Sequence, residues 1–166
     1  MKATSSRTGT FRQTVKVRDH ALTVDEPADQ GGEDSGPSPQ ELLAAALASC
    51  TAITMEMYAQ RKGWDVGGDD TGPSPQELLA ASLASCTAIT MEMYAKRKGW
   101  NTDGLEVDCD YTPAERGSPT RFALVMRMPA HLTDEQVERL SVIAAKCPVH
   151  RTLEGEVLFE EQVELV

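Results

Sequence analysis

Three of the four cysteines stand in sequence surroundings that bear on thiol chemistry. Cys50 and Cys86 each lie inside a small, apolar segment, ELLAAALASCTAIT and ELLAASLASCTAIT, and Cys147 opens the sequence CPVH. A thiolate is a strong nucleophile, whereas a thiol buried among apolar side chains has a raised pKa and is inert. Cys50 and Cys86 are therefore either core packing or nucleophiles whose charge is stabilised from elsewhere in the fold.

Cys147 has a local source of such stabilisation. Its thiol can accept amide N–H groups from the turn that begins at Pro148, and these lower the pKa of a thiol. This suits a resolving cysteine, which attacks a sulfenic acid on another cysteine. Cys147 and His150 also form half of a metal site, but no second ligand pair is visible, so we expect no metal. Cys109, in the alternating segment LEVDCDY, is expected to be buried packing.

The two repeated cysteine segments carry strong helix signals. Ser38 and Glu41 form a capping-box start and Gly63 suits the left-handed position after a helix, which predicts a helix over 39–62. The same residues recur thirty-six positions later and predict a helix over 75–98. Most of each helix is free of charge on every face, which is typical of a buried central helix rather than a surface helix.

These helices belong to a longer duplication. Residues 31–64 and 67–100 differ at only four positions, which are Glu33/Asp69, Ser35/Thr71, Ala46/Ser82 and Gln60/Lys96. Solenoid folds need three or more repeats and tolerate more divergence, so we interpret the pattern as a segmental duplication. The short connection predicts an antiparallel helix pair. Either one copy occupies the central position and the other is extruded, or both pack inside the chain and the extra copy takes a partner subunit's place.

Shorter elements surround the helices. Strands are expected at five places: 10–17, 21–24, 105–111, 121–128 and 155–166. A capping box at Thr133 and Gln136 starts a third helix that ends near Ala145, and a short helix follows Cys147. Strands and helices segregate rather than alternate, so the fold class is α+β, and we expect a single domain over 1–166.

The composition restricts the partners. The 166 residues carry a formal net charge of −10 and have a pI near 4.7, which disfavours nucleic acid and anionic membranes as partners, since both need a basic face. The longest apolar run, 42–48, is too short to cross a bilayer, and the first residues lack the apolar core of a signal peptide. Four cysteines without an export signal are typical of free thiols in a reducing compartment. We therefore expect a cytoplasmic protein.

The segments GPSPQELLAAALASCTAIT…RKGW and CPVHRTLEGEV together resemble the OsmC/Ohr superfamily, the osmotically induced and organic-hydroperoxide-resistance proteins, and especially its OsmC-like branch. With one copy of the repeat removed, the resemblance covers essentially the whole chain in order. It implies an OsmC-like fold in which strands and β-hairpins surround a long buried central helix. It also implies an intertwined homodimer with active sites at the subunit interface.

The resemblance further implies a thiol peroxidase that reduces organic hydroperoxides without a metal or bound cofactor. The peroxidatic cysteine of the family matches Cys86 or Cys50, and the resolving cysteine matches Cys147. An external thiol reductant completes the cycle. We favour Cys86 because its helix runs directly into the following hairpin, although the first copy has the matching continuity with the N-terminal strands.

The family stabilises its thiolate with an arginine from the N-terminal region. Arg7 is the best positional match, with Arg12 and Arg18 as competitors. The resemblance implies that a glutamate near the start of the central helix holds this arginine.

The glutamate departs from the family pattern. In peroxidases of the Ohr type the acid lies ten residues before the cysteine, a position that is Gln40 or Gln76 here. The acid follows one residue later, at Glu41 or Glu77. Each of these glutamates is first explained as the capping-box acid, so a catalytic arginine–glutamate pair stays an open hypothesis.

Two other functions stay open. The chain is alternatively a redox-responsive or hydrophobic-ligand-binding module with little turnover, or a helix-duplication variant of structural interest without activity. The displaced acid and the doubled helix favour these alternatives, whereas the paired cysteine motifs favour the peroxidase. Four helix methionines are interpreted first as core or interface packing and second as the lining of a greasy pocket: Met55, Met57, Met91 and Met93.

Overall fold

The computed structural model describes residues 1–64, 72–160 and 162. Its elements are, in chain order, β1 (Lys2–Arg7), β2 (Gln13–Val17), β3 (His20–Val24), the 3₁₀ turn η1 (Ala28–Gln30), α1 (Pro39–Arg61), α2 (Pro75–Lys98), β4 (Glu106–Thr112), β5 (Arg121–Arg127), α3 (Asp134–Ala144) and α4 (Pro148–Glu154). The predicted α+β class is confirmed.

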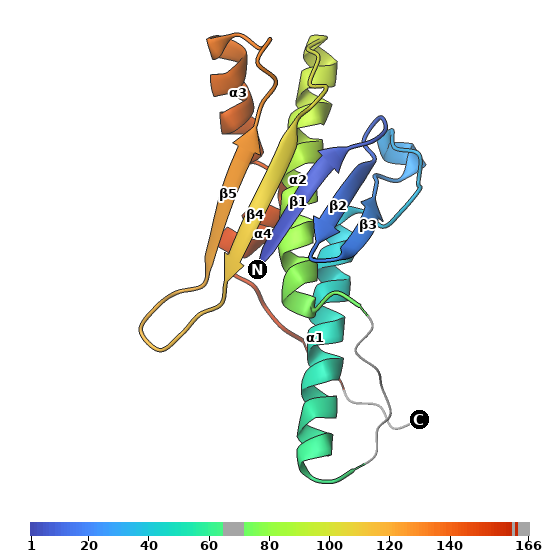
Figure 1. Cartoon of the computed structure of the whole chain (residues 1–166), viewed down its shortest axis with the longest axis vertical. Helices are drawn as coiled ribbons and strands as arrows, with labels where there is room; N and C mark the ends of the chain where they lie inside the picture. The colour runs from blue at the N-terminus through green and yellow to red at the C-terminus, as the bar shows by residue number, and fades with distance from the viewer. Residues whose placement is uncertain (65–71, 161, 163–166) are drawn as a thin grey trace.

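One antiparallel sheet and one long helix form the body of the molecule. The strand order is β3-β2-β1-β4-β5, and α2 lies across one face of the sheet (Figure 1). Ala3 of β1 stands opposite Val17 of β2 and Cys109 of β4, and all three side chains are buried toward the helix. The alternation of the strands thus supplies an apolar layer for α2 to cover.

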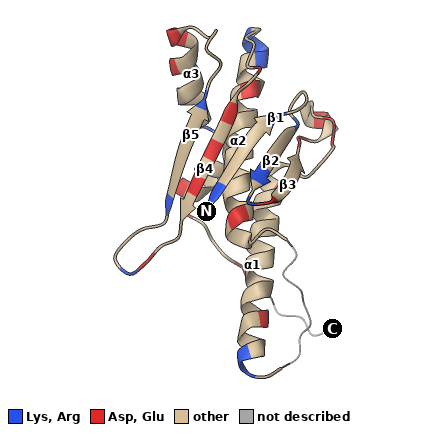
Figure 2. Cartoon of the chain, in the orientation of Figure 1, with Lys and Arg blue, Asp and Glu red and all other residues tan. Residues whose placement is uncertain are grey.

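The outer face of β4 carries the acidic residues of its alternating sequence (Figure 2). Asp108 is nevertheless buried. Its carboxylate accepts a hydrogen bond from Thr4 at 2.5 Å and forms ion pairs with Lys2 at 2.7 Å and Arg127 at 2.6 Å, which compensate for its burial. These contacts hold the pKa of Asp108 well below its usual value against the opposing effect of burial. The predicted hairpin is present as β4 paired with β5.

The two helix copies have nearly the same sequence and opposite environments. In α2 the buried residues run from Pro75 to Ala95, whereas α1 buries only Pro39, Leu42, Ala46 and Ala59. The expectation that each copy is a buried central helix is therefore correct for α2 and wrong for α1. Only one helix can cover the apolar face of this sheet, and α2 occupies that position.

The helices pack as the antiparallel pair that the short connection predicts. The first turns of α1 lie beside the first turns of α2, where Ser82 Oγ donates a hydrogen bond to the Pro39 carbonyl at 2.6 Å. The second half of α1 extends past the sheet (Figure 1). A group of large apolar side chains is exposed along α1 and just after it: Leu47, Ile53, Met55, Met57, Tyr58 and Trp64.

By length and composition alone, α1 and α2 are each able to cross a membrane. This is weak evidence, because the core helix of a soluble protein passes the same test, and α2 is largely buried within this fold.

Two further expectations are corrected. Strand β1 was not predicted, because KATSSR is polar and only Ala3 and Ser5 turn inward. The expected final strand is absent over 155–160, where Leu158 and Phe159 are exposed. Residues 161 and 163–166 of that expected strand lie outside the described part of the chain.

Candidate functional site

Cys86 and Cys147 meet in the protein core. Cys86 lies in the middle of α2, and Cys147 is the N-cap residue of α4. Both belong to the main hydrophobic cluster, with 3% and 0% of their surfaces exposed, and the two thiols are close enough for each to shift the pKa of the other. Of the two helix copies, it is therefore the second that brings its cysteine to the CPVH segment.

The hydrogen bonds around the pair place negative charge on Cys147. Its sulfur accepts the His150 N–H at 3.2 Å and the Thr87 hydroxyl at 3.7 Å. The neighbouring Cys86 thiol and these two hydrogen bonds lower the pKa of Cys147, although burial opposes them. The neighbouring Cys147 and burial raise the pKa of Cys86. Cys147 is therefore the more acidic thiol of the pair.

The other two cysteines lie apart from this pair. Cys50 is half-buried in α1 and lines an apolar cavity with Leu47 and Leu79. Cys109 is fully buried on the inner face of β4, where burial raises its pKa to about 12. Its surroundings are those of the packing residue that the sequence indicates.

Arg18 pairs with the glutamate at the start of α2. The guanidinium Nε lies 2.5 Å from the Glu77 carboxylate, which is only 6% exposed and also accepts the Ser74 N–H at 2.8 Å. Hydrogen bonds from Ser74 and the charge of Arg18 lower the pKa of Glu77 against the effect of burial. Glu77 thus caps the helix and also pairs with Arg18.

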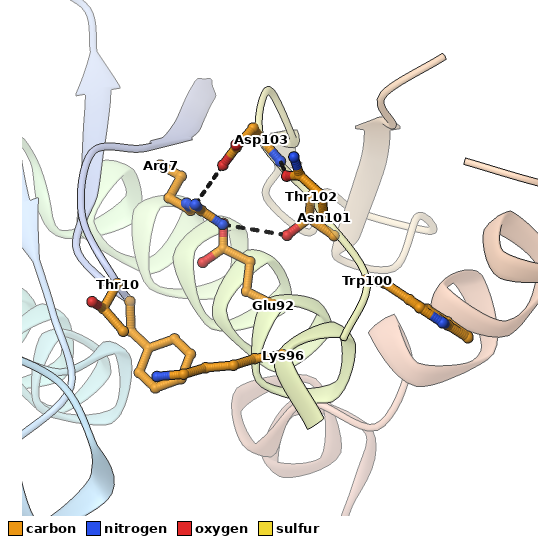
Figure 3. Close-up of a pocket in the computed structure, with 9 residues that line it drawn as sticks. Arg7, Thr10, Glu92, Lys96, Trp100, Asn101, Thr102 and Asp103 are labelled. Carbon is orange, nitrogen blue, oxygen red and sulfur yellow. Dashed lines mark hydrogen bonds and ion pairs between the residues drawn. The ribbon is translucent and has the colours of Figure 1, made fainter. Parts of the chain in front are cut away.

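Arg7, the best positional match, lies elsewhere. Its guanidinium pairs with Asp103 at 2.5 Å and donates to the Thr102 hydroxyl at 3.4 Å, beside Glu92 of α2 (Figure 3). These residues line a cavity of about 330 Å³ near the end of α2, and neither thiol of the pair lines it. Arg7 is thus brought to Glu92 and Asp103 rather than to Glu77.

Glu92 is a buried acid in this second region. Its Oε2 accepts a hydrogen bond from Gln13 at 2.9 Å, and among the described residues its Oε1 has no hydrogen-bond partner. Burial raises the pKa of Glu92 to about 8. Sequence reasoning missed Glu92, because nothing in the residues around it distinguishes it from its half-buried counterpart in α1, Glu56.

The remaining charged candidates are surface groups. Arg12 pairs with Glu33 at 3.0 Å, and both side chains are exposed. Glu41 caps α1 through the Ser38 N–H and hydroxyl, at 2.7 and 2.9 Å. The Glu41 contacts are those of a capping box, as the sequence indicates.

An apolar hollow flanks the thiol pair. A cavity of about 430 Å³ is lined by Leu83, one turn before Cys86, and by His150, one turn after Cys147. Leu79, Tyr111 and Leu153 line both this cavity and the one of about 480 Å³ that Cys50 lines. These cavities lie between α2, α4 and the β4–β5 hairpin, and neither thiol of the pair lines them.

Within residues 1–64, 72–160 and 162, no group of three or more His, Cys, Asp or Glu side chains is arranged to hold a metal ion. His150 instead pairs with Glu154 at 3.1 Å, one turn along α4. The chemistry that the arrangement offers is that of two adjacent thiols of unequal acidity.

The fold and the site together define a class of two-thiol α+β proteins. In this class one helix with a central cysteine crosses a sheet, and a cysteine that caps a second helix lies beside the first cysteine. The chain belongs to the OsmC-like protein family, whose model matches residues 32–69 and 67–162. The two matched stretches begin at the first and second copies of the duplicated segment.

Solved structures from several bacteria match the chain. An OsmC-like hydroperoxide resistance protein from Jannaschia sp. CCS1 has a TM-score of 0.58 and 17% identity, and the match covers 99% of this chain and 91% of that one. An OsmC-like protein from Mycoplasma pneumoniae has a TM-score of 0.46 and 14% identity, covering 92% and 86%. The organic hydroperoxide resistance protein OhrB of Bacillus subtilis has a TM-score of 0.41 and 18% identity, covering 93% and 91%. A search of curated protein sequences gave no match.

Proposed function

We propose that the chain is a thiol peroxidase that reduces organic hydroperoxides, with Cys86 as the attacking thiol and Cys147 as its base and resolving partner. The observation that carries the proposal is the buried pair of neighbouring thiols from α2 and α4, whose pKa values are shifted in opposite directions. Membership of the OsmC-like family supports a redox role, and the Jannaschia relative is described as a hydroperoxide resistance protein.

In the first step the charge on Cys147 activates Cys86. As the Cys86 sulfur attacks the outer peroxide oxygen, its proton passes to the Cys147 sulfur in the same step. The O–O bond breaks, the alkoxide takes the proton from Cys147 and leaves as the alcohol, and Cys86 becomes a sulfenic acid. A buried thiol with a raised pKa thereby reacts without a cation beside it.

In the second step the Cys147 thiolate attacks the sulfur of the sulfenic acid. A disulfide forms, and hydroxide leaves and takes up a proton as water. The protein has been oxidised by two electrons and the hydroperoxide reduced by two. An external thiol reductant returns the disulfide to two thiols by exchange. No metal or bound cofactor enters this scheme.

The cavity beside Leu83 and His150 suits an apolar hydroperoxide. Its aliphatic and aromatic lining, including Leu79, Tyr111 and Phe122, solvates an alkyl or aryl group while the peroxide reaches the thiols. We therefore propose that organic hydroperoxides, rather than hydrogen peroxide, are the preferred substrates. We also propose that the protein is cytoplasmic and acts as a homodimer.

Oxidation with one equivalent of cumene hydroperoxide tests this function. The expected products are one equivalent of the aryl alcohol and a disulfide between the peptides that contain Cys86 and Cys147, identified by mass spectrometry. If the hydroperoxide is consumed without this disulfide, or is not consumed at all, the proposal fails.

A second candidate function rests on the larger apolar cavity. Leu43, Leu47 and Cys50 of α1 face Leu79 of α2 and Phe159 across about 480 Å³, enough for a small apolar ligand. A hydrophobic-ligand-binding module predicts that an environment-sensitive apolar dye binds there and that Leu47→Asp abolishes this binding. The ligand-binding function is supported if the dye binds and the protein does not reduce cumene hydroperoxide. A helix-duplication variant without activity predicts neither result.

A further inference from the structure

The duplicated helices offer two occupants for one position in the core. Each buried residue of α2 has a counterpart thirty-six positions earlier in α1 that is usually exposed. Met91 is 0% exposed and Met55 is 63% exposed, and Ala84 is fully buried whereas Ala48 is exposed. Because the sequences are nearly identical, the side chains of α1 fit the central position about as well as those of α2.

Two differing positions lie within the helices. Ser82, which replaces Ala46, donates the buried hydrogen bond to Pro39, and Lys96, which replaces Gln60, lies 4.7 Å over the Phe11 ring. One neutral hydrogen bond and one surface cation–π contact are modest interactions. Neither requires the second copy in the central position, and alanine at position 46 leaves no polar group to be satisfied there.

The first copy already starts at the edge of this core. The Asp25 carboxylate accepts the Glu33 and Ser35 N–H groups at 3.1 and 3.2 Å and so holds the loop that leads into α1. Leu42, in the first turns of α1, belongs to the same hydrophobic cluster as Ala84 and Cys86 of α2. A helix that continued from this loop across the sheet would enter the central position directly.

The connections allow either copy to be the insertion. In the observed arrangement α1 is inserted before the central helix. With α1 in the central position, α2 would be inserted after it and before β4. The thirteen residues 62–74 span up to about 43 Å when extended, and a helix over 75–98 is about 36 Å long, so the chain can run out and return to β4.

We propose that the two helix copies exchange in the central position, and that Cys50 pairs with Cys147 in the exchanged arrangement. The pairing rests on the thiol pair of the proposed function, but the exchange itself does not depend on turnover. Two packings of one sequence that differ by few interactions form a two-state element. Irreversible oxidation of Cys86 places a charged group in the core, so it favours the exchange and presents Cys147 with a fresh thiol.

Ala84→Asp and its matched control Ala48→Asp test the exchange. Both put aspartate at the same position of the repeat, but only the first puts a carboxylate into the core of the observed arrangement. Circular dichroism reports whether each variant folds. Oxidation with diamide, followed by peptide mapping, reports which cysteine joins Cys147, because Ala46 and Ser82 give the two helix peptides different masses.

The expected result is a folded Ala84→Asp variant with the Cys50–Cys147 disulfide, and a folded Ala48→Asp variant with the Cys86–Cys147 disulfide. The double variant is expected to unfold, since neither copy then suits the core. The exchange is overturned if Ala84→Asp is unfolded, if it keeps the Cys86–Cys147 disulfide, or if the double variant folds equally well. If none of the folded proteins joins any cysteine to Cys147, the proposed function fails instead, while the folding result still decides the exchange.

Discussion

Arg18 pairs with Glu77 at 2.5 Å in the first turn of α2. Glu77 precedes Cys86 by nine residues, which places this ion pair about 13.5 Å from the thiol along the helix axis. The charge on Cys147 is therefore stabilised by hydrogen bonds from His150 and Thr87 and by the neighbouring Cys86 thiol, and the arginine stabilises the start of the helix.

We expect Arg18→Ala to lower the free energy of unfolding by about 1–2 kcal/mol, because the nearly buried Glu77 carboxylate loses a charged partner. Arg12→Ala is the matched control. It breaks an ion pair between two exposed side chains and should change stability by less than about 0.5 kcal/mol. Urea unfolding followed by circular dichroism measures both. Equal losses in the two variants would contradict the structural role of Arg18.

The lowered pKa of Cys147 predicts a thiolate near neutral pH. The difference in ultraviolet thiolate absorbance between the wild type and Cys147→Ser should titrate below the ordinary thiol value of about 8.5. Adding Cys86→Ala to both proteins should shift this midpoint upward, since the neighbouring Cys86 thiol has the largest effect in lowering the pKa of Cys147. Adding Cys50→Ala should leave it unchanged. If the titration midpoint of Cys147 is the same with and without Cys86, the two thiols do not interact as proposed.

The order of attack is open to a direct test with a sulfenic-acid probe such as dimedone. With cumene hydroperoxide as oxidant, Cys147→Ser should label slowly at Cys86, because Cys86 has lost its base. Cys86→Ser should leave Cys147 unlabelled. Rapid labelling of Cys147 in Cys86→Ser would instead make Cys147 the attacking thiol and reverse the proposed roles.

Because Glu92 is a buried acid, we expect the free energy of unfolding to fall as the pH rises. Burial raises its folded pKa to about 8 from the ordinary 4.5, so between these values the folded state binds more protons than the unfolded state, and stability falls as pH rises. Glu92→Gln should remove this slope, which is at most about 1.4 kcal/mol per pH unit. Glu56→Gln, at the matching position of α1, should leave it unchanged. Urea unfolding at about pH 5, 6.5 and 8 measures the slope, and identical slopes in all three proteins would contradict it.

The elements with local signals were predictable from the sequence. The capping boxes at Ser38, Ser74 and Thr133 are all present, because each depends on side chains three residues apart. The thiol cap at Cys147 is likewise a local feature, and His150 N–H bonds to it as the CPVH turn predicts.

The features that depend on distant contacts were not predictable. Nearly identical sequences form the buried α2 and the mostly exposed α1, so no property of the segment itself decides its environment. The partners of the N-terminal arginines likewise depend on distant contacts: the sheet register carries Arg7 toward Asp103, and the β2–β3 turn carries Arg18 toward Glu77. Short polar strands such as β1 give too weak an alternation to be recognised.

Thiol-dependent consumption of cumene hydroperoxide tests the central claim most directly. The proteins to compare are the wild type, Cys50→Ser, Cys86→Ser, Cys147→Ser and the double variant Cys50→Ser/Cys86→Ser, with dithiothreitol as reductant. Cys50→Ser should stay within about twofold of the wild-type rate, whereas Cys86→Ser and Cys147→Ser should lose at least about a hundredfold, as expected when a nucleophile or its base is removed. Any residual rate of Cys86→Ser should vanish in the double variant. Wild-type rates in both Cys86→Ser and Cys147→Ser would contradict the account.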